Sequence, residues 1–179
     1  MRAERGRTRR VERTAPVWLA PLAGGLLASF AMDLVQDGFT ALFERGRPEG
    51  DLDEEVEGIA GVIRVLSAAF PGVFPARHEH AQARALHYAF GVAFAAAYVA
   101  GARRAPWLAA GRGAAFGTGL FLVSDRVLIP ALKLGRPWAR YSRAERANAL
   151  LSHVAYGMVL ELTRAQLAGG EGEPKPAPG

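Results

Sequence analysis

Four long apolar runs, bordered at many points by arginine, constrain this chain more than any other feature. They cover residues 15–35, 85–102, 113–132 and 147–163. The first run has 18 uncharged residues before Asp33, and the second has 18 between its flanking arginines. Eighteen residues of helix span about 27 Å, which is close to the thickness of the hydrocarbon core of a bilayer. The pattern therefore predicts helices that cross a membrane.

Composition favours helices that pack closely over a sheet. Half of the residues are hydrophobic but only 9% are aromatic, and 21 are glycine. A length of 179 residues fits one domain. We predict an all-α integral membrane protein, a four-helix bundle within residues 15–168, in contact with the lipid bilayer. Its spans are expected at about 15–37, 85–102, 107–132 and 147–168. Four short spans enclose little space, so a homo-oligomer is expected.

The segment between the first two runs has a different pattern. Residues 52–70 begin with acidic side chains and end before Pro71-Gly72, as a helix does. Their apolar residues recur at helical spacing, namely Ile59, Val62, Ile63, Leu66, Ala69 and Phe70. We therefore predict an amphipathic helix, inserted between spans one and two, that lies on the membrane surface or covers the bundle.

Charge lies mostly outside the apolar runs. Six arginines fall within residues 1–14, and residues 169–179 are rich in Gly, Pro and Glu, so both tails are predicted to be disordered. The net charge is +5, and the arginines flank the apolar runs as they do in membrane proteins, without forming a basic groove. We therefore expect no nucleic-acid partner. The N-terminal cluster predicts cytoplasmic N- and C-termini. The basic loop 133–146 favours the opposite orientation.

The two halves of the chain resemble each other. Residues 23–35 align with 115–127, which places Asp33 on Asp125. The second and fourth runs share His-x-Ala-aromatic-Gly, beginning at His87 and His153. This pattern indicates a 2+2 internal repeat. The first run also has the basic front and apolar middle of a cleaved signal peptide, but its likeness to the third run favours a retained span.

Six ionisable residues fall within the predicted spans: Asp33, His87, Asp125, Arg126, His153 and Glu161. Ionisable groups at membrane depth are costly and normally face the bundle interior in pairs. We expect these six to form an intramembrane polar cluster. Two roles stay open, because the cluster can fix the register of the bundle or provide a pathway for protons or another small solute. The second role is that of a small transporter or channel component.

A cofactor is not expected, although haem is a second alternative. His87 and Gly91 are four residues apart, as are His153 and Gly157, so each glycine leaves a notch beside an imidazole. Two such histidines could ligate the iron of a flat macrocycle in an electron-transfer subunit, but no attachment motif is present.

Enzyme signatures are weak in this chain. The absence of cysteine excludes thiolate metal sites and cysteine nucleophiles. His78 and His80 lack a third metal ligand, and no nucleophile elbow or phosphate-binding loop is present. We therefore expect no catalytic residues and no metal site. A soluble helical protein remains the alternative to the membrane interpretation.

Two stretches carry a family resemblance. GAAFGTGLFLVSDRVLIPALKLG (113–135) and ANALLSHVAYGMVLELTR (147–164) resemble the YagU-like family of bacterial inner-membrane proteins, a domain family of unknown function. The likeness covers roughly residues 17–166 and is most specific over 114–164. Arg126 departs from the acidic or neutral residue expected after the aspartate. The resemblance implies an integral protein of the bacterial inner membrane and brings no reaction or cofactor.

Overall fold

The computed structural model describes residues 16, 18–43, 54–75, 78–134 and 137–169, and this part of the chain is helical without strands. The helices are α1 (Leu19–Phe43), α2 (Glu54–Ala69), α3 (Glu79–Ala102), α4 (Ala114–Val123), α5 (Ile129–Ala131) and α6 (Arg143–Gly169). A π turn, η3 (Ser124–Leu128), joins α4 to α5, and two short 3-10 turns are η2 (Pro106–Ala109) and η4 (Trp138–Arg140). The all-α prediction is confirmed. The tails predicted to be disordered lie outside the described residues, except for Gly169 at the end of α6.

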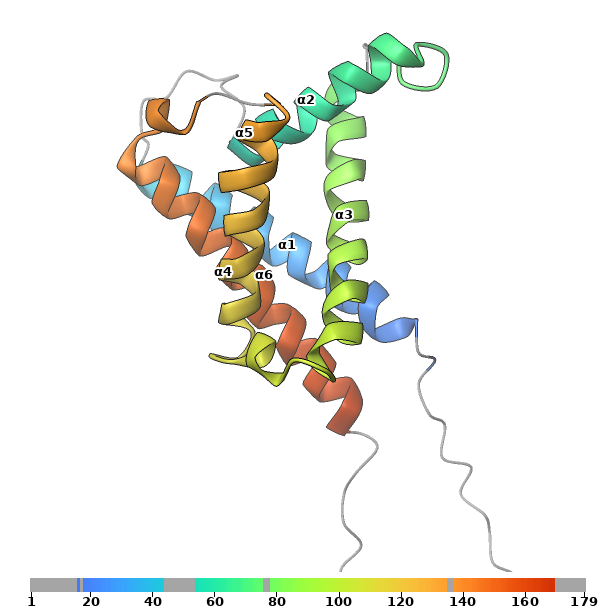
Figure 1. Ribbon diagram of the computed structural model, residues 1–179, viewed down its shortest axis with the longest axis vertical. Helices are drawn as coiled ribbons and strands as arrows, with labels where there is room; N and C mark the ends of the chain where they lie inside the picture. Colours follow the sequence, from blue (N-terminus) through green and yellow to red (C-terminus); the bar gives the residue numbers. More distant parts are fainter. Residues whose placement is uncertain (1–15, 17, 44–53, 76–77, 135–136, 170–179) are drawn as a thin grey trace, which may run out of the picture.

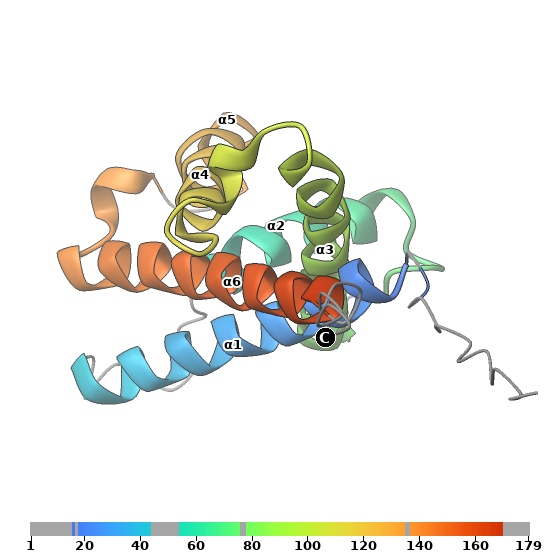
Figure 2. The same cartoon turned by 90° about the horizontal axis from the view of Figure 1, so that it is seen from below.

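The helices form two crossed layers. α1 and α6 lie side by side and run in opposite directions (Figure 2). α3 packs across α1, and α4 packs across α6, so that α3 and α4 stand on the same side of this pair (Figures 1 and 2). α2 runs across the end of the molecule where α3 begins and α5 lies (Figure 1). This arrangement places α3 opposite the α4–η3–α5 helix, with α2 bridging them at one end.

The α1 helix has small and polar residues inside and large apolar residues outside. Its buried face consists of Gly24, Gly25, Ala28, Ser29, Met32 and Gln36. Leu27, Phe30 and Leu34 are each more than half exposed. In water such an exposed apolar stripe would be costly. In lipid this pattern is expected. Small residues let two helix backbones approach closely, and lipid acyl chains are as apolar as the leucine side chains that would face them.

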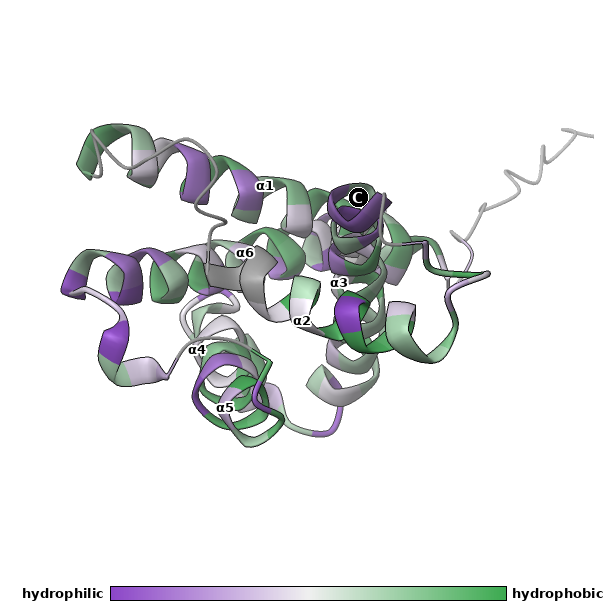
Figure 3. Cartoon of the chain, turned by 90° about the horizontal axis from the view of Figure 1, so that it is seen from above, coloured by the Kyte–Doolittle hydropathy of each residue, from purple (hydrophilic) through white to green (hydrophobic). Residues whose placement is uncertain are grey.

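The α6 helix has the same organisation. Asn148, Ser152 and His153 are buried, whereas Leu151 and Leu162 are exposed. Hydrophilic residues gather at the two ends of this helix, as the hydropathy colouring shows (Figure 3). Residues 147–160 between them are uncharged and span about 21 Å.

Three of the described helices are long and apolar enough to cross a membrane. They are Leu19–Phe43, Glu79–Ala102 and Ala114–Ala131. α6 is not one of them, because Arg143, Glu145 and Arg146 open it and Glu161 and Arg164 follow its uncharged stretch. The structure therefore supports membrane-spanning helices for three of the four predicted spans.

The α2 helix contacts the α5 end of the bundle through two glycines. A Cβ added to Gly58 would come 2.7 Å from Cδ1 of Ile129. Gly61 lies against the backbone of Leu134, where an added Cβ would come 3.0 Å from the carbonyl carbon. The absence of side chains at these two positions lets the amphipathic helix lie directly on α5 and the residues that follow it.

Glycines also lie at two close helix crossings. Gly25 of α1 faces Gly91 of α3, and an added Cβ on Gly25 would come 2.6 Å from Cα of Val92. Gly117 of α4 faces Gly157 of α6, and an added Cβ on Gly157 would come 2.7 Å from the Gly117 nitrogen. Because backbone atoms occupy the space in both cases, no larger residue fits without separating the helices.

Replacement of Gly25 by alanine should destabilise the fold. The new methyl group must push α1 away from α3, which costs about 1–3 kcal/mol as in other overpacked sites. The matched control is Gly38→Ala on the same helix, where nothing lies within 4 Å and alanine favours helix formation. Thermal unfolding in detergent measures the difference. Equal melting temperatures for the two variants would show that the crossing is not as close as described.

Candidate functional site

A cavity of about 210 Å³ lies among the helices. α3 and the α4–η3–α5 helix form its walls, α1 and α6 contribute residues between them, and α2 covers one end. Most of its lining is apolar, as with Met32, Phe90, Phe94, Leu120 and Ile129. The polar lining side chains are Ser29, His87, Ser124, Asp125, His153 and Tyr156. Both histidines of the repeated motif therefore reach the same cavity.

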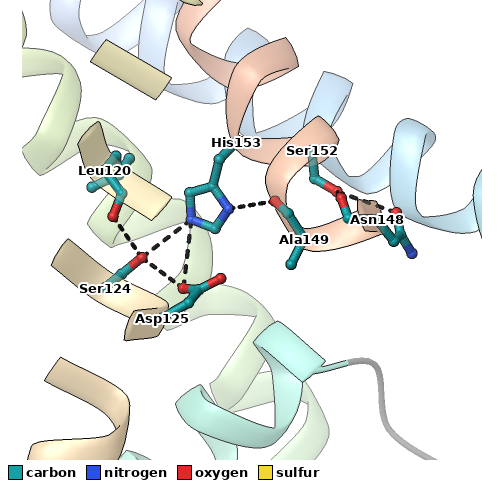
Figure 4. Close-up of polar contacts among 7 residues, drawn as sticks. All are labelled: Leu120, Ser124, Asp125, Asn148, Ala149, Ser152 and His153. Atoms are coloured by element: carbon teal, nitrogen blue, oxygen red, sulfur yellow. Dashed lines mark hydrogen bonds and ion pairs between the residues drawn. The ribbon is translucent and has the colours of Figure 1, made fainter. Parts of the chain in front are cut away.

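Ser124, Asp125 and His153 make one side of the cavity polar (Figure 4). The Ser124 hydroxyl lies 2.8 Å from the Leu120 carbonyl oxygen, 2.6 Å from Oδ1 of Asp125 and 3.3 Å from Nε2 of His153. Nε2 of His153 is 3.8 Å from the same carboxylate oxygen. Asp125 and His153 are only 5% and 4% exposed, so these contacts occur away from solvent.

The other nitrogen of His153 fixes the state of the ring. Nδ1 lies 2.8 Å from the Ala149 carbonyl oxygen, which can only accept a hydrogen bond. Nδ1 must therefore carry the hydrogen, so that Nε2 of the neutral ring presents a lone pair to Ser124 and Asp125. The single hydroxyl hydrogen of Ser124 is then surrounded by three acceptors.

The π turn brings Ser124 and Asp125 together on the α6 side. The Ile129 N–H donates to the Ser124 carbonyl, five residues earlier, instead of to the residue four back. Pro130 follows and cannot donate to the carbonyl of Arg126, so the regular α-helical pattern would be broken there in any case. The wider turn rotates less per residue than an α-helix, and two consecutive side chains can reach His153.

The first unit contains a second Asp–His pair. Nε2 of His87 on α3 lies 3.4 Å from Oδ1 of Asp33 on α1. The Tyr88 hydroxyl donates to Oδ2 of the same carboxylate at 2.8 Å. His87 also lines the cavity, whereas Asp33 lies behind it and is not part of the lining. Each motif histidine is thus paired with the aspartate of its own half.

The six ionisable residues do not form the single cluster that we expected. Glu161 lies in a separate group, where it accepts hydrogen bonds from Tyr98 at 2.6 Å and from Arg164 at 2.6 and 2.8 Å. Arg126 is exposed, and its guanidinium lies 4.2 Å from the centre of the Trp138 ring. Successive residues of a helix point in different directions, so the Arg126 side chain does not line the cavity that Asp125 lines. The expectation that Arg126 is inside is therefore wrong.

Several polar partners were not predicted from the sequence. The Tyr156 hydroxyl donates to the Gly91 carbonyl at 2.5 Å, which links the repeated motif of one half to that of the other. Tyr156 is the aromatic residue of the repeated motif that begins at His153, so the motif itself could have pointed to it. Tyr88, directly after His87, offered a weaker one. Ser124 gave no signal in the sequence, because its contact with His153 depends on the π turn.

The geometry does not match a serine hydrolase. In a catalytic triad the carboxylate holds Nδ1 of the histidine while Nε2 faces the serine. Here Asp125 and Ser124 both lie on the Nε2 side, and Nδ1 is held by the Ala149 carbonyl. Within the part of the chain that the structure describes, no group of three or more His, Asp or Glu could hold a metal ion.

The two histidines as placed do not fit a bis-histidine haem. Axial ligation requires a ring nitrogen of each histidine to direct its lone pair at the iron. Nε2 of His87 and Nε2 of His153 each lie within 4 Å of the carboxylate of their own aspartate, at 3.4 and 3.8 Å. Nδ1 of His153 is already held by a backbone carbonyl. We therefore derive no chemistry through a haem.

Comparison with family models identifies the region that carries this site. The model described as protein of unknown function (DUF1440) matches residues 63–162, which is more than half of the chain. The chain belongs to this family. Comparison with curated proteins and with solved structures found no match. The DUF1440 region contains α3, the α4–η3–α5 helix and most of α6, and therefore His87, Asp125 and His153, but not Asp33.

The tautomer of His153 is open to measurement. We expect its neutral ring to carry the hydrogen on Nδ1, because the Ala149 carbonyl can only accept. Nitrogen NMR of protein labelled at histidine distinguishes the two tautomers, and His153→Gln assigns the signal among the four histidines. A neutral ring with its hydrogen on Nε2 would contradict the contact between Nδ1 and the Ala149 carbonyl as described.

Proposed function

We propose that this protein passes protons through the cavity between α3 and the α4–η3–α5 helix and catalyses no chemical reaction. The observation that carries the proposal is that both motif histidines line one cavity, each beside the aspartate of its own half. The one hydroxyl hydrogen of Ser124 lies within reach of the Leu120 carbonyl, Asp125 and His153. A proton arriving on Nε2 of His153 would add a donor that faces Asp125 and Ser124.

Protonation of His153 would also strengthen its attraction to Asp125. A buried carboxylate is costly unless a cation or hydrogen-bond donors face it. An imidazolium at His153 would place a positive charge 3.8 Å from Asp125, and its new N–H could donate to the carboxylate or to Ser124. Loss of that proton returns the ring to the acceptor form. The pair can therefore hold a proton in one state and release it in the next.

His87 supplies a second proton-binding step. It lines the same cavity from the opposite wall, and its own carboxylate partner is Asp33 at 3.4 Å. Asp33 also accepts from Tyr88, whereas Asp125 accepts from Ser124. Two histidine–carboxylate pairs at one cavity, in different hydrogen-bonding states, supply two unequal sites for a proton.

An internal duplication explains why there are two such pairs. Asp33 and Asp125 align in the sequence, and each is paired with the following motif histidine. The glycine crossings correspond as well, with Gly25 against Gly91 in one half and Gly117 against Gly157 in the other. We infer that α1–α3 and α4–α6 are copies of one two-helix unit, with α2 inserted in the first.

The proposed setting is the bacterial inner membrane, as in the YagU-like family. α6 would be the fourth span of the bundle, with its charged ends at the two interfaces. The start of α1 and the end of α6 lie at the same end of the molecule, which supports placing both termini on one side, the cytoplasmic one (Figure 1). Homo-oligomers in the bilayer would let several such cavities act together.

Proton flux through reconstituted protein tests the proposal. Liposomes that contain the protein and an internal pH-sensitive dye should lose an imposed pH gradient faster than protein-free liposomes. Asp125→Asn and His153→Gln should return the rate to the protein-free background, because each removes one side of the proton-holding pair. The matched control is Glu161→Gln, whose carboxylate is held by Tyr98 and Arg164 and does not line the cavity.

Two results would decide against a proton pathway here. If liposomes with wild-type protein lose the pH gradient no faster than protein-free liposomes, the Asp–His pairs only fix the register of the bundle. If Glu161→Gln lowers the flux as much as Asp125→Asn does, the protons do not pass through the described cavity. Circular dichroism of each variant confirms that the helices are retained before flux is compared.

A further inference from the structure

We propose that a basic site beside Trp138, near the end of the α4–η3–α5 helix, binds the phosphate of an anionic membrane lipid. The site consists of Arg126 of η3, Trp138 of η4 and Arg146 of α6. It is separate from the cavity, because these three residues do not line it. The inference depends on the membrane-spanning helices and not on the proton pathway.

Two guanidinium groups of the site contact one indole ring. The central carbon of Arg126 lies 4.2 Å from the centre of the Trp138 ring, and that of Arg146 lies 5.2 Å from it. Both distances are within the range of cation–π attraction. The indole is itself packed between Phe121 and Tyr141, whose ring centres are each 5.8 Å away. Trp138 thus holds two arginines from different elements close to each other.

The two arginines keep hydrogen-bond donors for a further acceptor. Nη2 of Arg146 donates to the carbonyl oxygens of Trp138 at 3.0 Å and Ala139 at 3.4 Å, which fixes the guanidinium against η4. A guanidinium has five N–H groups, so the hydrogens on Nη1 remain. Arg126 contacts the ring and makes no hydrogen bond to another described residue. Both groups can therefore donate to the same anion.

The chain does not supply that anion. Asp125, next to Arg126 in the sequence, faces the cavity, and Glu145 accepts from the backbone N–H of Ser142 at 2.6 Å. Within the part of the chain that the structure describes, no carboxylate forms an ion pair with Arg126 or Arg146. Two neighbouring cations without a carboxylate favour an anion from outside the protein.

The depth of Arg126 favours a lipid as the source of the anion. It precedes Ala131, the last residue of an apolar span, by five residues, or about 7.5 Å along the helix. An exposed arginine at this depth extends its side chain along the lipid towards the headgroups. Tryptophan is enriched at the same level of membrane proteins, which fits Trp138 as the platform. The site therefore lies where lipid phosphates lie.

The charge around the site selects an anionic lipid over a zwitterionic one. Lys133, Arg140 and Arg143 are exposed and belong to the connection between α5 and α6 and to the first turn of α6. Their positive charge repels the ammonium group of a zwitterionic headgroup. Phosphatidylglycerol has a phosphate and an uncharged glycerol, and arginine can donate to two phosphate oxygens at once. The lipid assigned to the site is therefore phosphatidylglycerol.

Quenching of Trp138 fluorescence by brominated lipids tests this assignment. Replacement of Trp18 and Trp107 by phenylalanine leaves Trp138 as the only tryptophan of the chain. The protein is placed in phosphatidylcholine bilayers with a small fraction of brominated phosphatidylglycerol or, for comparison, the same fraction of brominated phosphatidylcholine. Random mixing gives equal quenching. We expect phosphatidylglycerol to be enriched beside Trp138 by at least about fivefold, because one surface arginine favours an anionic lipid by about that factor.

Two variants and a control locate the site. Arg126→Gln and Arg146→Gln should each lower the enrichment about fivefold, towards random mixing. Arg126 is exposed, so its variant retains the fold and decides the question if Arg146→Gln loosens η4. The matched control is Arg103→Gln, an exposed arginine that follows α3 at the other end of the molecule (Figure 1). It should leave the enrichment unchanged.

The outcomes separate a lipid from free phosphate. Equal quenching by the two brominated lipids overturns the site, and so does an enrichment that Arg126→Gln leaves unchanged. The measurement is repeated with chloride replaced by inorganic phosphate at constant ionic strength. An enrichment that persists in phosphate supports the lipid assignment, whereas its loss shows a site for free phosphate and overturns it.

Failure of this inference is distinguishable from failure of the proposed function. Arg126 does not line the cavity, so Arg126→Gln should pass protons as the wild-type protein does. Protein that passes protons without enriching phosphatidylglycerol keeps the proton pathway and loses the lipid site. Protein that enriches phosphatidylglycerol without proton flux keeps the lipid site and loses the proton pathway.

Discussion

The structure depends on one constraint, which is that the largest apolar side chains of its long helices face outward and its small and polar ones face inward. α1 buries Gly25, Ala28 and Ser29 and exposes Leu27 and Phe30. The hydrophobic effect cannot hold such helices together, since their largest apolar side chains face outward. Close backbone contact at glycine and hydrogen bonds among buried polar groups must do so instead. The same constraint explains why the ionisable groups inside the bundle are paired, because an unpaired charge there has no water to contact.

The close crossings and the polar pairs are two parts of one arrangement. In each half, the motif glycine lets two helices touch, and the histidine one turn earlier meets an aspartate of the neighbouring helix. This gives Gly25–Gly91 with Asp33–His87, and Gly117–Gly157 with Asp125–His153. The Tyr156 hydroxyl on the Gly91 carbonyl then connects the halves. α3 and α4 remain apart above α1 and α6, and the cavity lies between them. The packing that stabilises the fold therefore also positions the groups that we propose to carry protons.

Much of the fold could be predicted from the sequence, and much of the site could not. Apolar runs of bilayer length predicted helices where α1, α3 and α4–η3–α5 occur, because that signal is local. The repeat placed aspartate and histidine at matching points, but only the structure shows which groups meet. Ser124 reaches His153 because η3 is a π turn, and hydropathy carries no sign of that. The Glu161–Arg164 pair was readable from its i, i+3 spacing and was missed because Glu161 was assigned to the central cluster.

The most direct test of this account asks what surrounds the outer face of α1. The chain has no cysteine, so single cysteines at Leu27, Phe30 and Leu34 can each carry a nitroxide spin label without further changes. In liposomes, electron paramagnetic resonance compares collisions of the label with oxygen, which concentrates in lipid, and with a water-soluble nickel complex. The account predicts frequent collisions with oxygen and few with nickel at all three positions. Free access of the nickel complex to these positions would show that the face is in water and would contradict the account.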